Sequence, residues 1–229
     1  MDLDSAFDVG GNAFKAMTFS DQDAREVADQ ACPYMDSQAK IAPANSKYTR
    51  RLNAIAKKLN MPEVNGAQTN YKVYLTKDIN AFAMANGCIR VYSGLMDMMT
   101  DDEVMGVVGH EIGHVALGHT RKRMQVAYAT AAARGAAAAS GNSTIVTLNQ
   151  SQLGELSESL IHAQYSQANE SAADDYSFDL LTERRLNTRG LVTAFQKLAA
   201  LNGGKSDMFS SHPSASDRAS RLEARMNTK

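Results

Sequence analysis

Hydrophobic positions recur with a helical period over the first part of the chain. Ser20 can cap a helix that we expect to run to about Lys40, although Pro33 should bend or interrupt it. Ser46 can cap a second helix, which runs to about Asn60. The predicted apolar face of this second helix consists of Leu52, Ile55, Ala56 and Leu59.

The pattern changes after Pro62, where hydrophobic and polar residues begin to alternate. Alternation over residues 71–75 predicts a strand, and residues 80–84 form a second extended segment. Asn86-Gly87 is a strong hairpin signal, so the chain should return as a third strand over residues 88–92. A small, largely antiparallel sheet is therefore expected before the next helix.

Helical patterns return after the sheet. A short helix over residues 95–99 leads to a longer one from Thr100 to Thr120, where Thr100 and Glu103 can form a capping box. Further helices are expected over residues 150–166, 169–186 and 187–203, and after Pro213. This order of elements predicts a mostly helical α+β fold, with residues 20–229 as one domain and residues 1–19 as a flexible tether.

Charge and composition exclude some classes of partner. The hydrophobic fraction is 44% and the formal net charge is −1, so no global attraction to nucleic acid or to a membrane surface is expected. The triplet Arg121-Lys122-Arg123 is interpreted as a solvated helix end. No apolar run approaches the ~20 residues that span a bilayer, and the first residues have neither the basic nor the apolar region of a signal peptide. Cys32 and Cys88 can be a disulfide or two buried thiols.

The strongest chemical signal is the run Gly109-His110-Glu111-Ile112-Gly113-His114. His110 and His114 are four positions apart on a predicted helix, so both imidazoles leave the same face and can reach one metal ion. Glu111 can contact a water on that ion but is poorly placed to join the two histidines as a ligand. This H-E-x-x-H pattern is typical of zinc peptidases, with two ligands and a general base.

A catalytic zinc usually has three protein ligands, so one more is needed. His119 should lie on the opposite face of a continuous helix, and Leu117 and Thr120 exclude the longer metzincin pattern. Glu170 is the better candidate because Asp174, one helical turn later, can orient a ligating histidine. The residues alone leave rival ligands open, namely Glu155, Glu158 and His162.

The motifs together resemble the HtpX-like zinc peptidases, relatives of the CAAX-prenyl endopeptidases. The shared features are H-E-x-x-H, a later E-x-x-x-D, Asn80-Ala81-x-Ala83 before a strand and Gly94-Leu95, and a C-terminal His212-Pro213. The resemblance implies a zincin-type fold of the glutamate-liganded class. It implies one zinc ion held by His110, His114 and Glu170, with Asp174 supporting one of the histidines.

The same resemblance implies further residues of the site. His212 would lie near the zinc and stabilise the oxyanion, beside Glu111 as the catalytic base. An extended peptide would add to the edge strand that consists of Asn80, Ala81, Phe82, Ala83 and Met84. The membrane-spanning segments of the HtpX proteins themselves have no counterpart in this chain.

The amino-acid sequences of several segments are similar to those of bacterial envelope members of the family. That similarity implies a periplasmic protein attached to the outer membrane as a lipoprotein, and in that oxidising space a Cys32–Cys88 disulfide is favoured. The leader and the lipid-bearing cysteine are not in this chain, so attachment is an inference from the resemblance.

The expected function is zinc-dependent endoproteolysis of unfolded or damaged envelope proteins, without nucleic-acid partners. The alternative is a zinc-stabilised holdase or binding module with a blocked site, because the Ala-, Gly- and Ser-rich residues 129–149 could cover the cleft as a lid.

Overall fold

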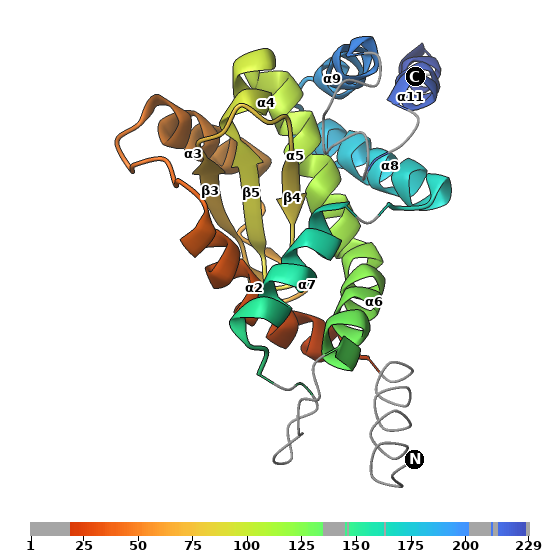
Figure 1. Ribbon diagram of the computed structural model, residues 1–229. Helices are drawn as coiled ribbons and strands as arrows, with labels where there is room; N and C mark the ends of the chain where they lie inside the picture. The colour runs from red at the N-terminus through yellow and green to blue at the C-terminus, as the bar shows by residue number, and fades with distance from the viewer. Residues whose placement is uncertain are drawn as a thin grey trace, which may run out of the picture.

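The computed structural model has the predicted mostly helical α+β architecture (Figure 1). It describes residues 19–134, 145, 147–162, 164–201, 212 and 215–227. The helices are α2 (Asp21–Gln38), α3 (Lys47–Leu59), α4 (Ser93–Met98), α5 (Asp101–Ala116), α6 (His119–Arg134), α7 (Gln150–His162), α8 (Gln167–Glu183), α9 (Arg189–Ala200) and α11 (Ala215–Asn227). The strands are β1 (Glu63–Val64), β2 (Ala67–Gln68), β3 (Asn70–Tyr74), β4 (Ala81–Ala83) and β5 (Cys88–Tyr92). Except for Phe19, the predicted tether lies outside the described residues.

Three helices begin at the predicted capping residues. The hydroxyl oxygens of Ser20, Ser46 and Thr100 each accept a hydrogen bond from the backbone N–H three residues later. Helix α2 nevertheless continues through Pro33, so of the two expected effects of this proline an interruption is excluded. The missing N–H of a proline removes one helical hydrogen bond, and the burial of Ala31 and Met35 on either side favours the helix.

The three-stranded sheet has the order β3-β5-β4 and is mixed rather than largely antiparallel. β4 and β5 form the predicted hairpin, in which Gly87 has a φ of 78° and the N–H of Met84 donates to the carbonyl of Cys88 at 2.9 Å. β3 pairs with β5 in parallel over five residues, from Asn70 opposite Cys88 to Tyr74 opposite Tyr92. β5 is therefore the central strand, and β4 lies at an edge.

Helix α5 occupies the centre of the larger hydrophobic core. It contacts β4 and β5 on one side and α8 and α9 on the other, as Figure 1 shows. Its residues Val104, Val107, Val108 and Ile112 are fully buried. A second core joins α2, α6 and α7, with Val27, Met124 and Leu156 among its members. The predicted core helix thus lies between the sheet and the C-terminal helices.

The expected continuous helix from Thr100 to Thr120 is broken near its end. α5 stops at Ala116, and α6 starts at His119 after a turn in which Gly118 has a φ of 74°. A positive φ is easily adopted by glycine and commonly ends a helix. The break means that the geometry of residues beyond Ala116 cannot be read from the helical period of α5.

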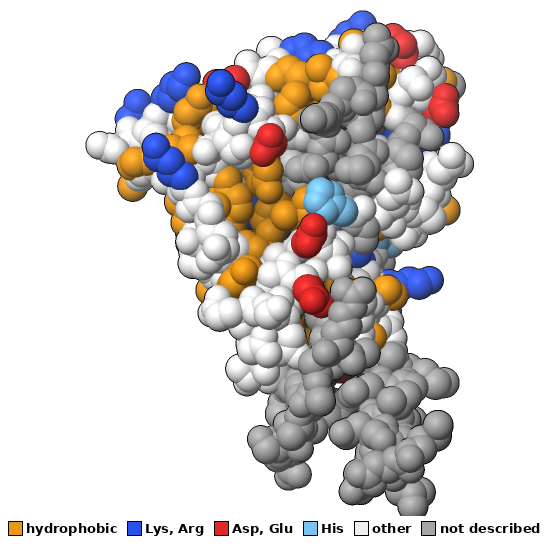
Figure 2. All heavy atoms as spheres, viewed as in Figure 1, with side chains coloured by type: hydrophobic (Ala, Val, Ile, Leu, Met, Phe, Trp, Pro, Cys, Tyr) orange, Lys and Arg blue, Asp and Glu red, His pale blue; other side chains and the backbone are white. Residues whose placement is uncertain are grey.

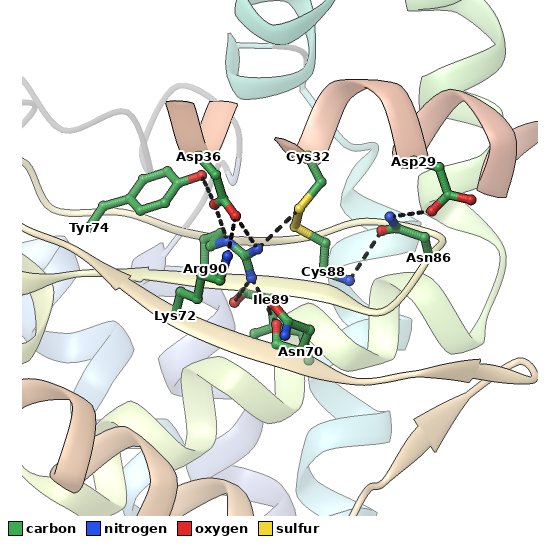
Figure 3. Close-up of a disulfide and its surroundings, with 10 residues drawn as sticks. All are labelled: Asp29, Cys32, Asp36, Asn70, Lys72, Tyr74, Asn86, Cys88, Ile89 and Arg90. Atoms are coloured by element: carbon green, nitrogen blue, oxygen red, sulfur yellow. Dashed lines mark hydrogen bonds and ion pairs between the residues drawn. A yellow bond between two sulfur atoms is a disulfide. The ribbon is translucent and has the colours of Figure 1, made fainter. Parts of the chain in front are cut away.

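A disulfide joins Cys32 of α2 to Cys88 at the start of β5, as the resemblance implied. Figure 3 shows Asp36, one helical turn after Cys32, pointing at Arg90 of the same strand. Arg90 donates to both carboxylate oxygens of Asp36, at 2.7 and 2.9 Å, and the other donors to that carboxylate are Lys72 and Tyr74. These contacts fix α2 against the lower part of the sheet.

The remaining helices lie close to their predicted positions. α7 ends at His162, earlier than expected, and α8 spans Gln167–Glu183. The side chain of Asn187 accepts from the N–H of Arg189 at 3.1 Å at the start of α9. Among the described residues, every helix is too short or too polar to cross a membrane.

Candidate metal centre

Small residues on α5 bring α8 close to the two histidines of the H-E-x-x-H motif. A Cβ atom at Gly109 would lie 2.6 Å from the hydroxyl oxygen of Ser177, and one at Gly113 would lie 3.0 Å from the carbonyl oxygen of Ala173. Neither position leaves room for a larger side chain without movement of α8. The tight contact places Glu170 and Asp174 of α8 beside His110 and His114.

Four buried donor side chains converge at this contact. The Nε2 atoms of His110 and His114 lie 3.0 Å apart, and Glu170 Oε1 lies 3.2 Å from His114 Nε2. His212 Nδ1 lies 2.9 Å from the same glutamate oxygen and 3.2 Å from His110 Nε2. One ligand atom from each of the four residues lies within 4.8 Å of all the others. Imidazole nitrogen and carboxylate oxygen are ligands that zinc prefers, so the donor set fits this metal.

Asp174 determines which nitrogen of His110 faces the centre. Its Oδ1 atom lies 2.9 Å from His110 Nδ1. The carboxylate accepts the Nδ1 proton, and the lone pair of His110 is then at Nε2, directed at His114 Nε2. His114 Nε2 lies 3.0 Å from this nitrogen and 3.2 Å from Glu170 Oε1, so the lone pair of His110 faces two further atoms that can bind a metal ion. This arrangement is the structural reason that the cluster suits a metal ion.

Charges around the carboxylates keep both of them ionised. Burial acts to raise the pKa of Glu170, but the adjacent His212 and His114 outweigh it and lower that pKa. Burial also acts to raise the pKa of Asp174, and hydrogen bonds from Arg218 and His110 lower it. Both side chains are therefore available as acceptors or ligands at neutral pH.

Arg218 of α11 is a residue of this cluster that the sequence analysis missed. It donates to both oxygens of Asp174, at 2.9 and 2.6 Å, and its Nη1 atom lies 2.5 Å from Glu170 Oε2. Its guanidinium group also lies over the ring of Phe195, 3.9 Å from the centroid. The signal was in the sequence, because Arg218 interrupts an apolar helical stripe formed by Ala215, Ala219 and Leu222.

Glu111 lies at the edge of the donor set with an unpaired oxygen. It is 3% exposed, and its Oε1 atom has no hydrogen-bond partner among the described residues. His212 Nε2 lies 3.5 Å from this oxygen. Glu111 also lines a narrow pocket with Phe82, Ala83 and Met84 of the predicted edge strand. The predicted base and the predicted substrate strand therefore face the same space.

His119 and the rival ligands lie outside the donor set. His119 Nδ1 contacts His114 at Nδ1, 3.0 Å away, on the side of that ring opposite the centre. His119 was predicted to lie on the helix face opposite His110, on the assumption of one unbroken helix. That assumption is wrong, because α5 ends before His119. His119 is nevertheless not among the converging donors. The three rivals on α7 are not among these donors either, and Glu158 and His162 are exposed.

The ring of Tyr165 covers His114 from the outside. The two rings are stacked, with centroids 3.7 Å apart and planes at 12°. Arg123 of α6 lies over the ring of Tyr165, with its guanidinium carbon 4.7 Å from the ring centroid. Of the predicted lid, residues 129–149, residues 135–144 and 146 lie outside the described residues, and residues 129–134 belong to α6. Among the described residues, Tyr165, which lies between α7 and α8, is therefore the one whose ring stacks on His114.

Comparison with known proteins places the geometry in a family. Residues 44–226 match the model of Peptidase family M48. The chain is 54% identical to the metalloprotease LoiP of Escherichia coli over 99% of its own length and 90% of that protein, and 51% identical to the metalloprotease YcaL of the same organism over 99% and 89%. It is also 27% identical to the mitochondrial metalloendopeptidase OMA1 of Bos taurus, over 64% of this chain and 30% of that protein. With its buried histidine and glutamate donors, this chain belongs to Peptidase family M48 and is a zinc metalloprotease.

Proposed function

We propose that the protein is an endopeptidase that hydrolyses peptide bonds in unfolded or damaged proteins of the bacterial cell envelope. The observation that carries this proposal is the unpaired Oε1 atom of Glu111 beside the converging donors His110, His114 and Glu170. A buried carboxylate oxygen without a partner is costly in a folded protein. Its position next to a metal site is explained if it has a proton to accept during the reaction.

The side chains have distinct proposed roles. His110, His114 and Glu170 would hold zinc, which would supply Lewis-acid chemistry to the scissile carbonyl and to the attacking water. Glu111 accepts a proton from that water and passes it to the leaving amine. Asp174 holds the proton on His110 Nδ1, and Arg218 keeps Asp174 ionised and in place. His212 can stabilise the oxyanion if it turns an N–H toward the substrate carbonyl.

The edge strand supports an unfolded substrate. β4 has a neighbour on only one side in the sheet, and a chain that adds to its other side must be extended with free backbone groups. Asn80 supports the start of this strand, because its side-chain oxygen accepts the N–H of Ala81 at 2.9 Å. Figure 2 shows hydrophobic side chains gathered over β4 and β5 on the face beside α7. Extended segments with apolar side chains are features of unfolded proteins.

The proposed location follows from the disulfide and from the family resemblance. A Cys32–Cys88 bond persists in an oxidising space such as the bacterial periplasm. We propose that the protein works there, attached to the outer membrane by a lipid on a residue that precedes this chain. Its partners are then envelope proteins rather than nucleic acids.

The test compares the wild-type protein with Glu111→Gln on casein, an unfolded protein. The variant should retain zinc, because Glu111 is not among the converging donors, and should lose at least about 10³-fold in cleavage rate because no base is present. Zinc content is measured by atomic emission and cleavage by the release of fluorescent fragments. Cleavage by Glu111→Gln at the wild-type rate would refute the assignment of the base.

A second candidate function has a specific observation in its favour. His212 supplies a fourth protein donor, and four protein ligands are typical of structural zinc sites with no place for water. With the site closed in this way, the metalloprotease would bind unfolded chains as a zinc-dependent holdase in its resting state, without cleaving them. The test measures casein binding and casein cleavage by the wild-type protein and by His212→Ala. Binding that a chelator abolishes, with no fragments from either protein, would favour the holdase. Cleavage by either protein would favour the peptidase.

A further inference from the structure

A large cavity lies behind the Tyr165 ring that covers His114. Its volume is about 780 Å³, within the range of ligand pockets in proteins. Three elements form it, namely the first turns of α6, the end of α7 and the start of α8. We call it the α6–α8 cavity. His119 and Tyr165, which both contact His114, belong to its wall.

The charges on this wall are of one sign. The lining side chains that can carry a positive charge are His119, Arg121, Lys122, Arg123 and His162, and none of the described lining residues is an aspartate or a glutamate. Arg121 and Lys122 are exposed, as expected of a solvated helix end, and the triplet 121–123 lies in the first turns of α6, where it also lines the cavity.

Little negative charge compensates this wall. Arg121 pairs with Asp21 of α2 at 3.3 Å. Within the described part of the chain, no carboxylate forms an ion pair with Lys122 or Arg123, and the Nε atom of Arg123 is buried without a hydrogen-bond partner. The positive charges of Lys122 and Arg123 are therefore available to an anion that enters the cavity.

Two helix N-termini add to the positive potential. α6 has no acidic residue in its first turn, although a helix N-terminus favours negative charge. α8 begins beside the cavity with Ser166 as its capping residue, and Glu170, the acidic residue of its first turn, is used in the metal cluster. Cations at helix N-termini are unfavourable by themselves. A bound anion would remove this unfavourable arrangement.

The cavity is adjacent to the reaction space. Tyr165 and Arg123 line both the α6–α8 cavity and the narrow pocket that contains Glu111 and the end of the edge strand. A chain that passes Glu111 along β4 would therefore reach this wall within a few residues. On the basis of the proposed peptidase function, we propose that the α6–α8 cavity is a subsite that binds a carboxylate of the substrate, close to the scissile bond.

The test measures binding and cleavage with matched peptides. A casein-derived peptide that the protein cleaves is made with Glu or Gln at each of the three positions on either side of the bond, and with a free or an amidated C-terminus. Zinc-loaded Glu111→Gln is used for dissociation constants, by fluorescence anisotropy, and the wild-type protein for kcat/KM. Two ion pairs at a half-exposed site should make one Glu peptide bind about five- to tenfold tighter than its Gln partner, with the difference shrinking at 0.5 M salt.

Variants of the wall identify the pocket. Lys122→Gln combined with Arg123→Gln should reduce the Glu/Gln ratio to about one, whereas Arg123→Lys should retain most of it because the charge remains. Lys57→Gln, at an exposed lysine of α3, is the matched control and should retain the full ratio. Zinc content and melting temperature show whether each variant is folded.

The outcomes separate this proposal from the peptidase function. Equal binding and cleavage of all Glu and Gln peptides, or a ratio that persists in the double variant, would overturn the subsite. A preference for the free C-terminus over the amide assigns the cavity to a terminal carboxylate, and a preference for Glu at one position assigns it to an acidic side chain. If the protein cleaves no casein, the Glu and Gln substitutions are made in a casein-derived peptide that zinc-loaded Glu111→Gln binds; a Glu preference that is lost in the double variant then supports the carboxylate site although the peptidase function fails.

Discussion

Two buried arginines of this protein each donate two hydrogen bonds to an aspartate, but the two pairs have different roles. Arg90 is 1% exposed and Arg218 is 5% exposed, and each donates through Nε and Nη2 to both oxygens of an aspartate, Asp36 or Asp174. One pair lies on the sheet beside the disulfide, as Figure 3 shows, and the other lies at the metal centre. The difference between them lies in what surrounds the two carboxylates.

The cluster around Arg90 is complete. Asp36 also accepts from Lys72 and Tyr74, and Arg90 donates to the carbonyl oxygen of Asn70 at 2.8 Å. The cluster around Arg218 is incomplete, because it leads through Asp174 to His110, whose Nε2 atom faces the other converging donor atoms of the metal centre. A buried ion pair with all its hydrogen bonds is a structural unit, whereas one that leaves acceptors unpaired can hold a cation.

The largest expected effect is a loss of bound zinc on substitution in the cluster around Arg218, which the cluster around Arg90 should not show. Glu170→Ala removes a converging carboxylate ligand, so bound zinc should fall to near zero and proteolysis should be lost by at least about 10³-fold. Zinc is measured by atomic emission after dialysis. Unchanged zinc content would return the rival ligands to consideration, and Glu158→Ala, at an exposed position, is the matched control.

The next effect concerns stability without zinc. Arg90→Met removes both hydrogen bonds that Arg90 donates to Asp36 and leaves Lys72 as the remaining ion-pair partner of this partly buried carboxylate, which should lower the free energy of unfolding by about 2 kcal/mol while zinc content stays unchanged. Arg189→Met, at an exposed arginine, should change stability by less than about 0.5 kcal/mol. Urea unfolding with chelator present measures both. A loss of zinc in Arg90→Met would show that the two clusters are not independent.

A matched pair of aspartate substitutions sharpens the contrast. Asp174→Asn should weaken zinc binding by about 10- to 100-fold, because His110 loses the carboxylate that orients its ring. Asp36→Asn should leave the zinc dissociation constant unchanged. Competition with a chromogenic chelator gives both constants. Equal effects of the two substitutions would mean that Asp174 has only a structural role.

The smallest expected effect is a pH dependence at the structural cluster. Burial acts to raise the pKa of Asp36, but hydrogen bonds from Arg90, Lys72 and Tyr74 lower it from 3.8 to about 2. Because the folded pKa lies below the unfolded one, the stabilisation is complete above about pH 4 and is lost as the pH falls toward 2. It amounts to about 2 kcal/mol.

This dependence is measured by comparing the zinc-free wild-type protein with Asp36→Asn. The difference in their free energies of unfolding should be about 2 kcal/mol at pH 6 and should approach zero near pH 2. A difference that stays constant with pH would show that Asp36 does not titrate between these values.

Much of the local structure could be predicted, because local signals determine it. The capping hydroxyls of Ser20, Ser46 and Thr100 and the Asn86-Gly87 turn act within three or four residues of themselves. The parallel pairing of β3 with β5 was missed because pairing across a crossover depends on packing against α3 and α5. The break at Gly118 was also missed, since a glycine in a helical pattern is compatible with either outcome.

The sequence by itself determined the H-E-x-x-H half of the site. Backbone hydrogen bonds fix the turn of a helix, so His110 and His114 had to share a face and Glu111 had to lie next to them. Only the tertiary structure decided the other half. His212 and Arg218 come from 102 and 108 residues away in the chain to contact His110. Their approach depends on the burial of the C-terminal helices and on the small residues between α5 and α8, which no local period encodes.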